Sequence, residues 1–60
     1  MTPAQTKTLL IAMATEARDL NAQSIRITGQ PIAMVQIIES ILVAGIAGLN
    51  KMINEDASEP

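Results

Sequence analysis

The sequence predicts an all-α fold, an antiparallel two-helix hairpin that assembles into a homo-oligomeric helical bundle. Three observations predict it. Apolar residues recur at spacings of three and four through both halves of the 60-residue chain. One break, Thr28-Gly29-Gln30-Pro31, divides the halves. The chain is long enough for only one domain. We expect a hairpin over residues 1–54 and an acidic disordered tail over residues 55–60, which carries Glu55, Asp56 and Glu59.

The first helix is expected over residues 3–27. Thr2 can cap it, Pro3 suits the first helical position, and the Gln5 amide can reach back to the cap. Residues 24–28 also alternate as a short strand would, but we favour helix because the helical spacing continues to Ile27. The face expected to contact the second helix comprises Leu9, Leu10, Met13, Ala17, Leu20, Ser24 and Ile27.

The turn is expected at residues 28–30, with Gly29 in the left-handed conformation that closes a helix. The second helix then runs over residues 31–54, and so short a connection makes the two helices antiparallel neighbours. A tight turn there pairs apolar residues along the hairpin, for example Leu10 with Leu49 and Ala17 with Leu42.

The second helix carries more apolar surface than one partner helix can cover. Its apolar arc spans roughly 200°, against about 100° for an ordinary amphipathic helix. Two glycines within it each cost about 0.8–1.0 kcal/mol relative to alanine, so we expect another helix to approach closely there. We expect self-association, most simply as a dimeric four-helix bundle, although a larger ring or docking of another protein fits the same stripe. The expected oligomer interface comprises Met34, Ile37, Ile41, Ala44, Gly45, Gly48 and Met52.

Composition excludes most chemistry. The chain has no His, no Cys and no aromatic residue, so it has no imidazole base, no thiolate or imidazole metal ligand and no base-stacking ring. We expect no enzyme, catalytic residue, metal or cofactor. Without the acidic end the chain has four basic and three acidic residues, and so nearly neutral a body disfavours general nucleic-acid binding. Gln36, Glu39 and Ser40 interrupt the longest apolar segment and disfavour membrane spanning, so we expect a cytoplasmic protein.

The leading functional hypothesis is a non-enzymatic oligomeric interaction module, a small regulator or inhibitor that binds a partner protein. The alternative is an oligomeric sponge that sequesters an anionic small molecule, such as a nucleotide signal, between protomers through Lys7, Arg18 and Arg26. A small membrane-associated hairpin is the second alternative.

In layout the chain resembles the Rop family of small plasmid copy-number regulators, through its early Thr2, its central turn at Gly29 and Gln30, and its acidic C-terminal end. The resemblance implies a hairpin that dimerises into a four-helix bundle. RNA binding in that family uses several basic residues and an aromatic residue on the first helix. This first helix has Lys7, Arg18 and Arg26 and no aromatic residue, so we do not extend RNA binding to it.

Overall fold

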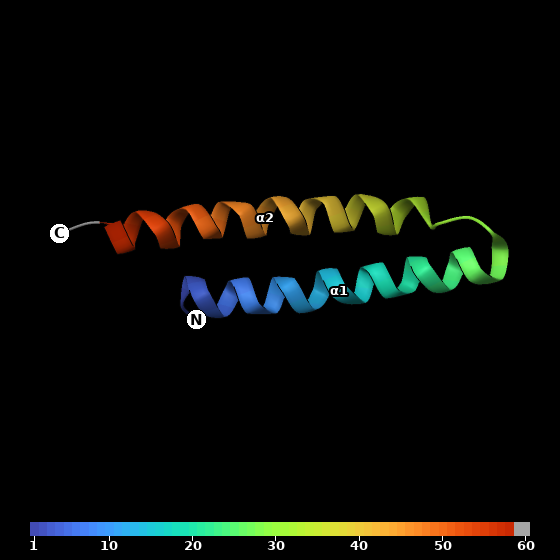
Figure 1. The fold of residues 1–60 in the computed structure, drawn as a ribbon, viewed down its shortest axis with the longest axis horizontal. Helices are drawn as coiled ribbons and strands as arrows, with labels where there is room; N and C mark the ends of the chain where they lie inside the picture. Colours follow the sequence, from blue (N-terminus) through green and yellow to red (C-terminus); the bar gives the residue numbers. More distant parts are fainter. Residues whose placement is uncertain (59–60) are drawn as a thin grey trace.

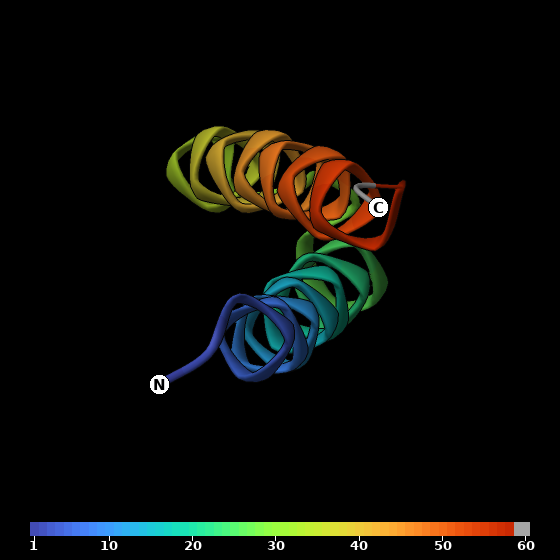
Figure 2. The same cartoon turned by 90° about the vertical axis from the view of Figure 1, so that its left-hand side faces the viewer.

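The computed structural model describes residues 1–58 and shows two antiparallel helices joined by a short connection. Helix α1 spans Pro3–Thr28 and helix α2 spans Ala33–Ser58. The two helices lie side by side and form a rod of 53 × 15 × 13 Å (Figure 1). Seen end-on, they cross at an angle (Figure 2). The predicted all-helical hairpin is therefore confirmed, and residues 24–28 are helix rather than strand.

Both ends of α1 follow from its sequence. The Gln5 backbone N–H donates to Thr2 Oγ1 at 3.1 Å, and the Thr2 N–H donates to Gln5 Oε1 at 2.8 Å, which completes a reciprocal capping box. Pro3 fills the first helical position, where no backbone donor is needed. At the other end Gly29 adopts φ 79° and its N–H donates to the Ile25 carbonyl oxygen at 2.8 Å.

The connection between the helices, residues 29–32, folds back along α1, and we call it the strap. Ser24 Oγ donates to the Gln30 carbonyl oxygen at 2.8 Å, and the Ile32 N–H donates to Asn21 Oδ1 at 2.9 Å. Each bond ties a strap residue to a position earlier on α1. Helix α2 consequently begins alongside α1, before the end of α1 is reached, as Figure 1 shows.

The strap changes the pairing of residues that was expected from a tight turn. Leu10 lies against Gly45 rather than Leu49, which displaces α2 by about one helical turn. Because residues 29–32 all belong to the connection, α2 begins at Ala33 and not at residue 31.

The far end of α2 also differs from the expected boundary. The helix continues to Ser58 instead of ending at residue 54, since no glycine or proline follows Gly48 before residue 60. Residues 55–58, expected in a disordered tail, are therefore helical, and the rest of that predicted tail, residues 59–60, lies outside the described residues.

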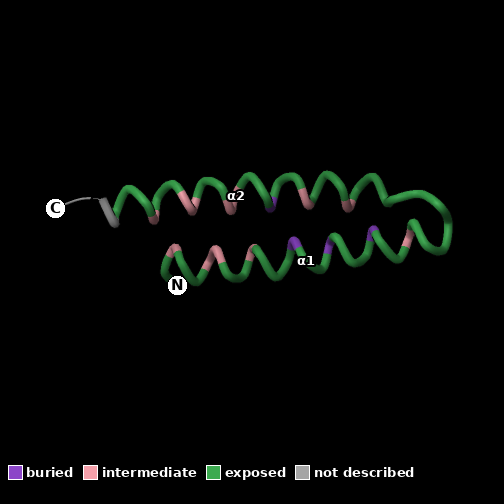
Figure 3. Tube along the Cα trace, viewed as in Figure 1, coloured by how far each residue is buried: buried purple, intermediate pink, exposed green. Residues whose placement is uncertain are grey.

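Very little of the hairpin is buried. Among residues 1–56, the buried side chains are Ala14, Ala17, Asn21 and Leu42, and they lie on the edges where the helices face each other (Figure 3). The face of α1 that meets α2 is rotated from the expected one. Of the predicted set, Leu10, Ala17 and Ser24 lie toward α2, whereas the remaining four are exposed: Leu9, Met13, Leu20 and Ile27.

The rotation has a physical cause in two kinds of residue. Ala14 and Ala17 carry the smallest side chains that a helix can present without the cost of glycine, so α2 can approach α1 closely there. Asn21, the third buried residue of α1, must face the strap to accept the Ile32 N–H. When the buried face of α1 is predicted from apolar content alone, the polar Asn21 is excluded from it and Leu20 is placed there instead.

Candidate functional site

One face of the hairpin carries an unusual amount of exposed apolar surface. We call it the apolar face and define it by nine residues: Leu9, Met13, Leu20 and Ile27 of α1, and Met34, Ile37, Ile38, Ile41 and Met52 of α2. Each exposes between 45% and 84% of its surface. At 100° per residue the α1 members fall on one side of the line of contact between the helices, and the α2 members fall on the same side.

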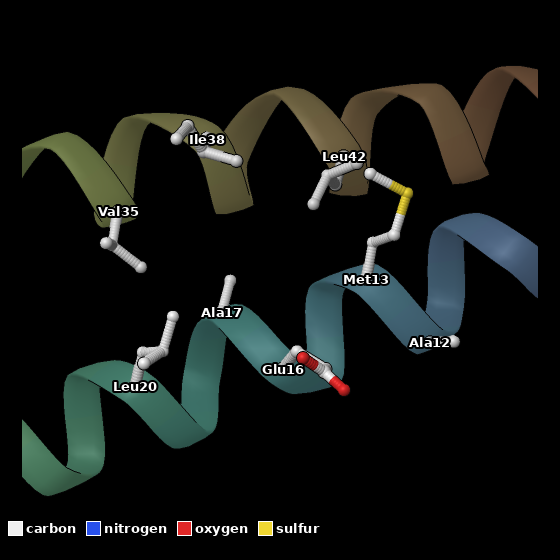
Figure 4. A pocket seen from close by; sticks show the side chains of 8 residues that line it. All are labelled: Ala12, Met13, Glu16, Ala17, Leu20, Val35, Ile38 and Leu42. Carbon is white, nitrogen blue, oxygen red and sulfur yellow. The ribbon is translucent and has the colours of Figure 1, made fainter.

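A groove between the helices joins the two halves of this face. It measures about 350 Å³ and opens to solvent. Figure 4 shows Met13, Ala17 and Leu20 reaching from α1, and Val35 and Leu42 reaching from α2, toward the space between the helices. Ile38 and Ala12 complete the apolar lining. The one charged lining residue is Glu16, whose carboxylate lies at the α1 edge of the groove.

The size of the apolar face sets it apart from an ordinary protein surface. The chain exposes 4574 Å², whereas a compact protein of 6.4 kDa exposes about 3,800 Å². The nine side chains together expose on the order of 1,000 Å², against roughly 300–600 Å² for the largest apolar patch of a typical monomer. A standard protein interface covers about 800 Å² on each partner, so this face has the size of a complete interface.

The opposite side of the hairpin has a different character. Arg18 Nε donates to Glu39 Oε1 at 2.8 Å and links the two helices there. The side chains expose 67% and 25% of their surfaces, so solvent weakens this ion pair. Ile11, Ile25 and Val43 are exposed on the same side, scattered among polar residues. Single exposed apolar residues of this kind are ordinary on a protein surface.

The expected interface residues of α2 fall into two groups in the structure. Gly45 faces α1, because a Cβ atom added to it would lie 3.2 Å from Leu10 Cδ1. It therefore serves packing within the hairpin. The other six are exposed and lie along one side of α2: Met34, Ile37, Ile41, Ala44, Gly48 and Met52.

The three cations considered for anion binding are not brought together in one chain. Arg18 pairs with Glu39, Lys7 is half-buried, and Arg26 is exposed in the last turn of α1. With a rise of 1.5 Å per residue, Arg18 lies about 16 Å from Lys7 and about 12 Å from Arg26 along the helix axis. The groove offers an anion only the carboxylate of Glu16 as a charged neighbour.

Sequence reasoning missed Asn21 and the contribution of α1 to the apolar face. The sequence does contain a signal for Asn21. Residues at alternating spacings of three and four form a seam typical of paired helices, and Asn21 is one of these residues. Half of the members of that seam are polar, namely Lys7, Asn21 and Ser24, so a search by apolar content alone passes over it. The full seam is Lys7, Leu10, Ala14, Ala17, Asn21 and Ser24.

Helix α2 also meets a simple criterion for a membrane span. Its segment Ala33–Asp56 is long and apolar enough to cross a bilayer by length and composition, and little of it is buried in the hairpin. No family model matches the chain, and neither does any curated protein or solved structure.

Proposed function

We propose that the protein is a small non-enzymatic interaction module that self-associates through its apolar face and acts as a regulator or inhibitor by binding a partner. The observation that carries the proposal is the apolar face itself. Nine large side chains are each at least 45% exposed on one side of a hairpin whose buried apolar residues, among residues 1–56, are Ala14, Ala17 and Leu42.

The energetics of so thin a hairpin support assembly. Burying apolar surface contributes about 25 cal/mol per Å², and two alanines with one leucine supply little of it. A chain this short is marginal even when it is compact, and this one contains no cysteine for a disulfide. Pairing two apolar faces supplies the missing burial, as in homodimers that have no stable folded monomer.

Absolute mass by light scattering on gel filtration, over a hundredfold concentration range and with circular dichroism alongside, tests the proposal. We expect a helical species of fixed mass with at least two copies. Leu20→Glu should shift this species toward monomer, because the substitution places a charge on the apolar face. Ile25→Glu is the matched control, since Ile25 exposes 49% of its surface on the opposite side and Leu20 exposes 51%. A folded monomer at every concentration would refute self-association.

A second candidate is a membrane-associated hairpin, which the length and exposure of α2 favour. Against it, Glu39 lies inside the apolar segment Ala33–Asp56 and pairs with Arg18, and a charged side chain within a bilayer is costly. Flotation with phosphatidylcholine vesicles separates the candidates. Recovery in the vesicle fraction, with no stable species in aqueous buffer, would favour the membrane; a stable aqueous oligomer that does not float would favour the module.

A further inference from the structure

The two glycines of α2 differ in what their missing side chains leave room for. Each costs about 0.8–1.0 kcal/mol of helix stability relative to alanine. Leu10 accounts for Gly45, because a Cβ atom there would crowd Leu10 Cδ1 at 3.2 Å. At Gly48 an added Cβ would meet nothing within 4 Å among the described residues. A side chain from another molecule would fill the space beside Gly48, as Leu10 fills the space beside Gly45.

The exposed side of α2 is complementary to itself when two copies run antiparallel. If Ile37 is placed opposite Gly48, the same register places Ile41 opposite Ala44 and Met34 beside Met52. Each isoleucine then meets a small residue, and the flexible methionines meet at the two ends. A parallel arrangement would instead set isoleucine on isoleucine and glycine on glycine, which leaves clashes and gaps along the helix.

The occupant of the apolar face follows from this pattern and from its area. The face exposes on the order of 1,000 Å², about the 800 Å² per partner that a stable interface needs. A two-fold arrangement uses the same patch on both partners, which is what a self-complementary stripe provides.

We infer that a second copy of this chain packs its α2 antiparallel on α2, about a two-fold axis near residues 42 and 43, with Ile37 of each copy seated over Gly48 of the other. The inference rests on the proposed self-association and adds its geometry. Met13 and Leu20 of α1 line the groove with Val35 and Ile38, on the same side of the hairpin.

A large-for-small exchange tests the pairing directly. Gly48→Leu should raise the dimer dissociation constant at least tenfold, because overpacking a contact costs typically 1–3 kcal/mol and 1.4 kcal/mol is tenfold. Leucine is a far better helix former than glycine, so a loss of assembly cannot be ascribed to loss of helix. Adding Ile37→Ala should restore the constant to within about threefold of the original, since it vacates the space that the new leucine needs. Ala47→Leu, an exposed neighbour outside the stripe, is the matched control and should change little.

Distances between copies test the direction of the helices. The chain has no cysteine, so single spin labels can be placed at Ser40→Cys or Lys51→Cys, both exposed positions on α2. With 1.5 Å rise per residue, the antiparallel pair separates these labels along the axis by roughly 8 Å at position 40 and 26 Å at position 51. The measured distance should therefore be clearly longer at position 51.

The outcomes separate the two proposals. A dimer with equal distances at both positions, or one that Gly48→Leu leaves intact, overturns the antiparallel pairing and leaves self-association standing. A helical monomer overturns both, and flotation of that monomer with phosphatidylcholine vesicles would show that lipid covers the face instead.

Discussion

Removing the Asn21 side chain should release the strap that sets where α2 begins. Asn21 exposes 7% of its surface, and its Oδ1 accepts the Ile32 N–H at 2.9 Å. In Asn21→Ala the partly buried Ile32 N–H loses its hydrogen-bond acceptor. A donor left unpaired in this way costs about 1–3 kcal/mol, and the helix propensity of alanine returns only a few tenths. We therefore expect a net loss of roughly 1–2 kcal/mol.

Urea unfolding followed by circular dichroism measures the loss, at one fixed protein concentration because the stability of any chain that self-associates depends on concentration. Asn21→Asp keeps an acceptor oxygen at the N-terminal end of α2, where a negative charge is favourable, and should lose less than half as much as Asn21→Ala. Gln23→Ala changes an exposed residue on the same helix and should stay within about 0.5 kcal/mol of the original protein.

Amide hydrogen exchange gives the local readout. Loss of this hydrogen bond should speed exchange at Ile32 about tenfold relative to amides in the middle of α1, which corresponds to 1.4 kcal/mol of local opening. If Asn21→Ala unfolds at the same urea concentration as Gln23→Ala and leaves Ile32 exchange unchanged, the bond does not hold the strap, and the displaced register needs another cause.

Two further predictions concern contacts between the helices. A double-mutant cycle with Arg18→Gln and Glu39→Gln should give a coupling of about 0.2–1 kcal/mol that shrinks in 1 M salt, because solvent reaches the pair through the exposed Arg18 side chain. A coupling above 2 kcal/mol would mean that the pair is shielded from solvent. Gly45→Ala should stabilise the hairpin by less than the 0.8–1.0 kcal/mol of its helix propensity, since Leu10 must move, and a Leu10→Ala background should recover the difference in urea unfolding. An equal gain in both backgrounds would contradict the contact.

The helices and their caps could be predicted from the sequence because they depend on residues that are neighbours along the chain. The capping box of Thr2 and Gln5 and the left-handed Gly29 are local chemistry, set by residues within three or four positions of one another. The break between the halves was readable for the same reason. Such features are predictable from one chain without knowing what the chain packs against.

The register and the rotation of α1 were not predictable from apolar content. They depend on bonds from Asn21 and Ser24 to the strap, which act across 11 and 6 residues. When residues are scored by hydrophobicity, a polar residue makes a helix face look less suited to burial. In this hairpin, however, the polar residue Asn21 determines which face of α1 is buried. The same error hid the contribution of Leu20 to the apolar face, since the predicted face had placed Leu20 inside the hairpin.

The difference between the two sides of the hairpin bears on how assembly would end. A chain with apolar surface on both sides could add copies without limit, because each new copy would offer a fresh face. Here the side that carries Arg18 and Glu39 is polar apart from scattered residues, while the large side chains gather on the other side. Pairing through the self-complementary stripe would cover the exposed apolar residues of α2 in both copies and leave the two polar sides outward. The Arg18–Glu39 pair would then contribute little to stability and much to solubility, by keeping a closed dimer from stacking further.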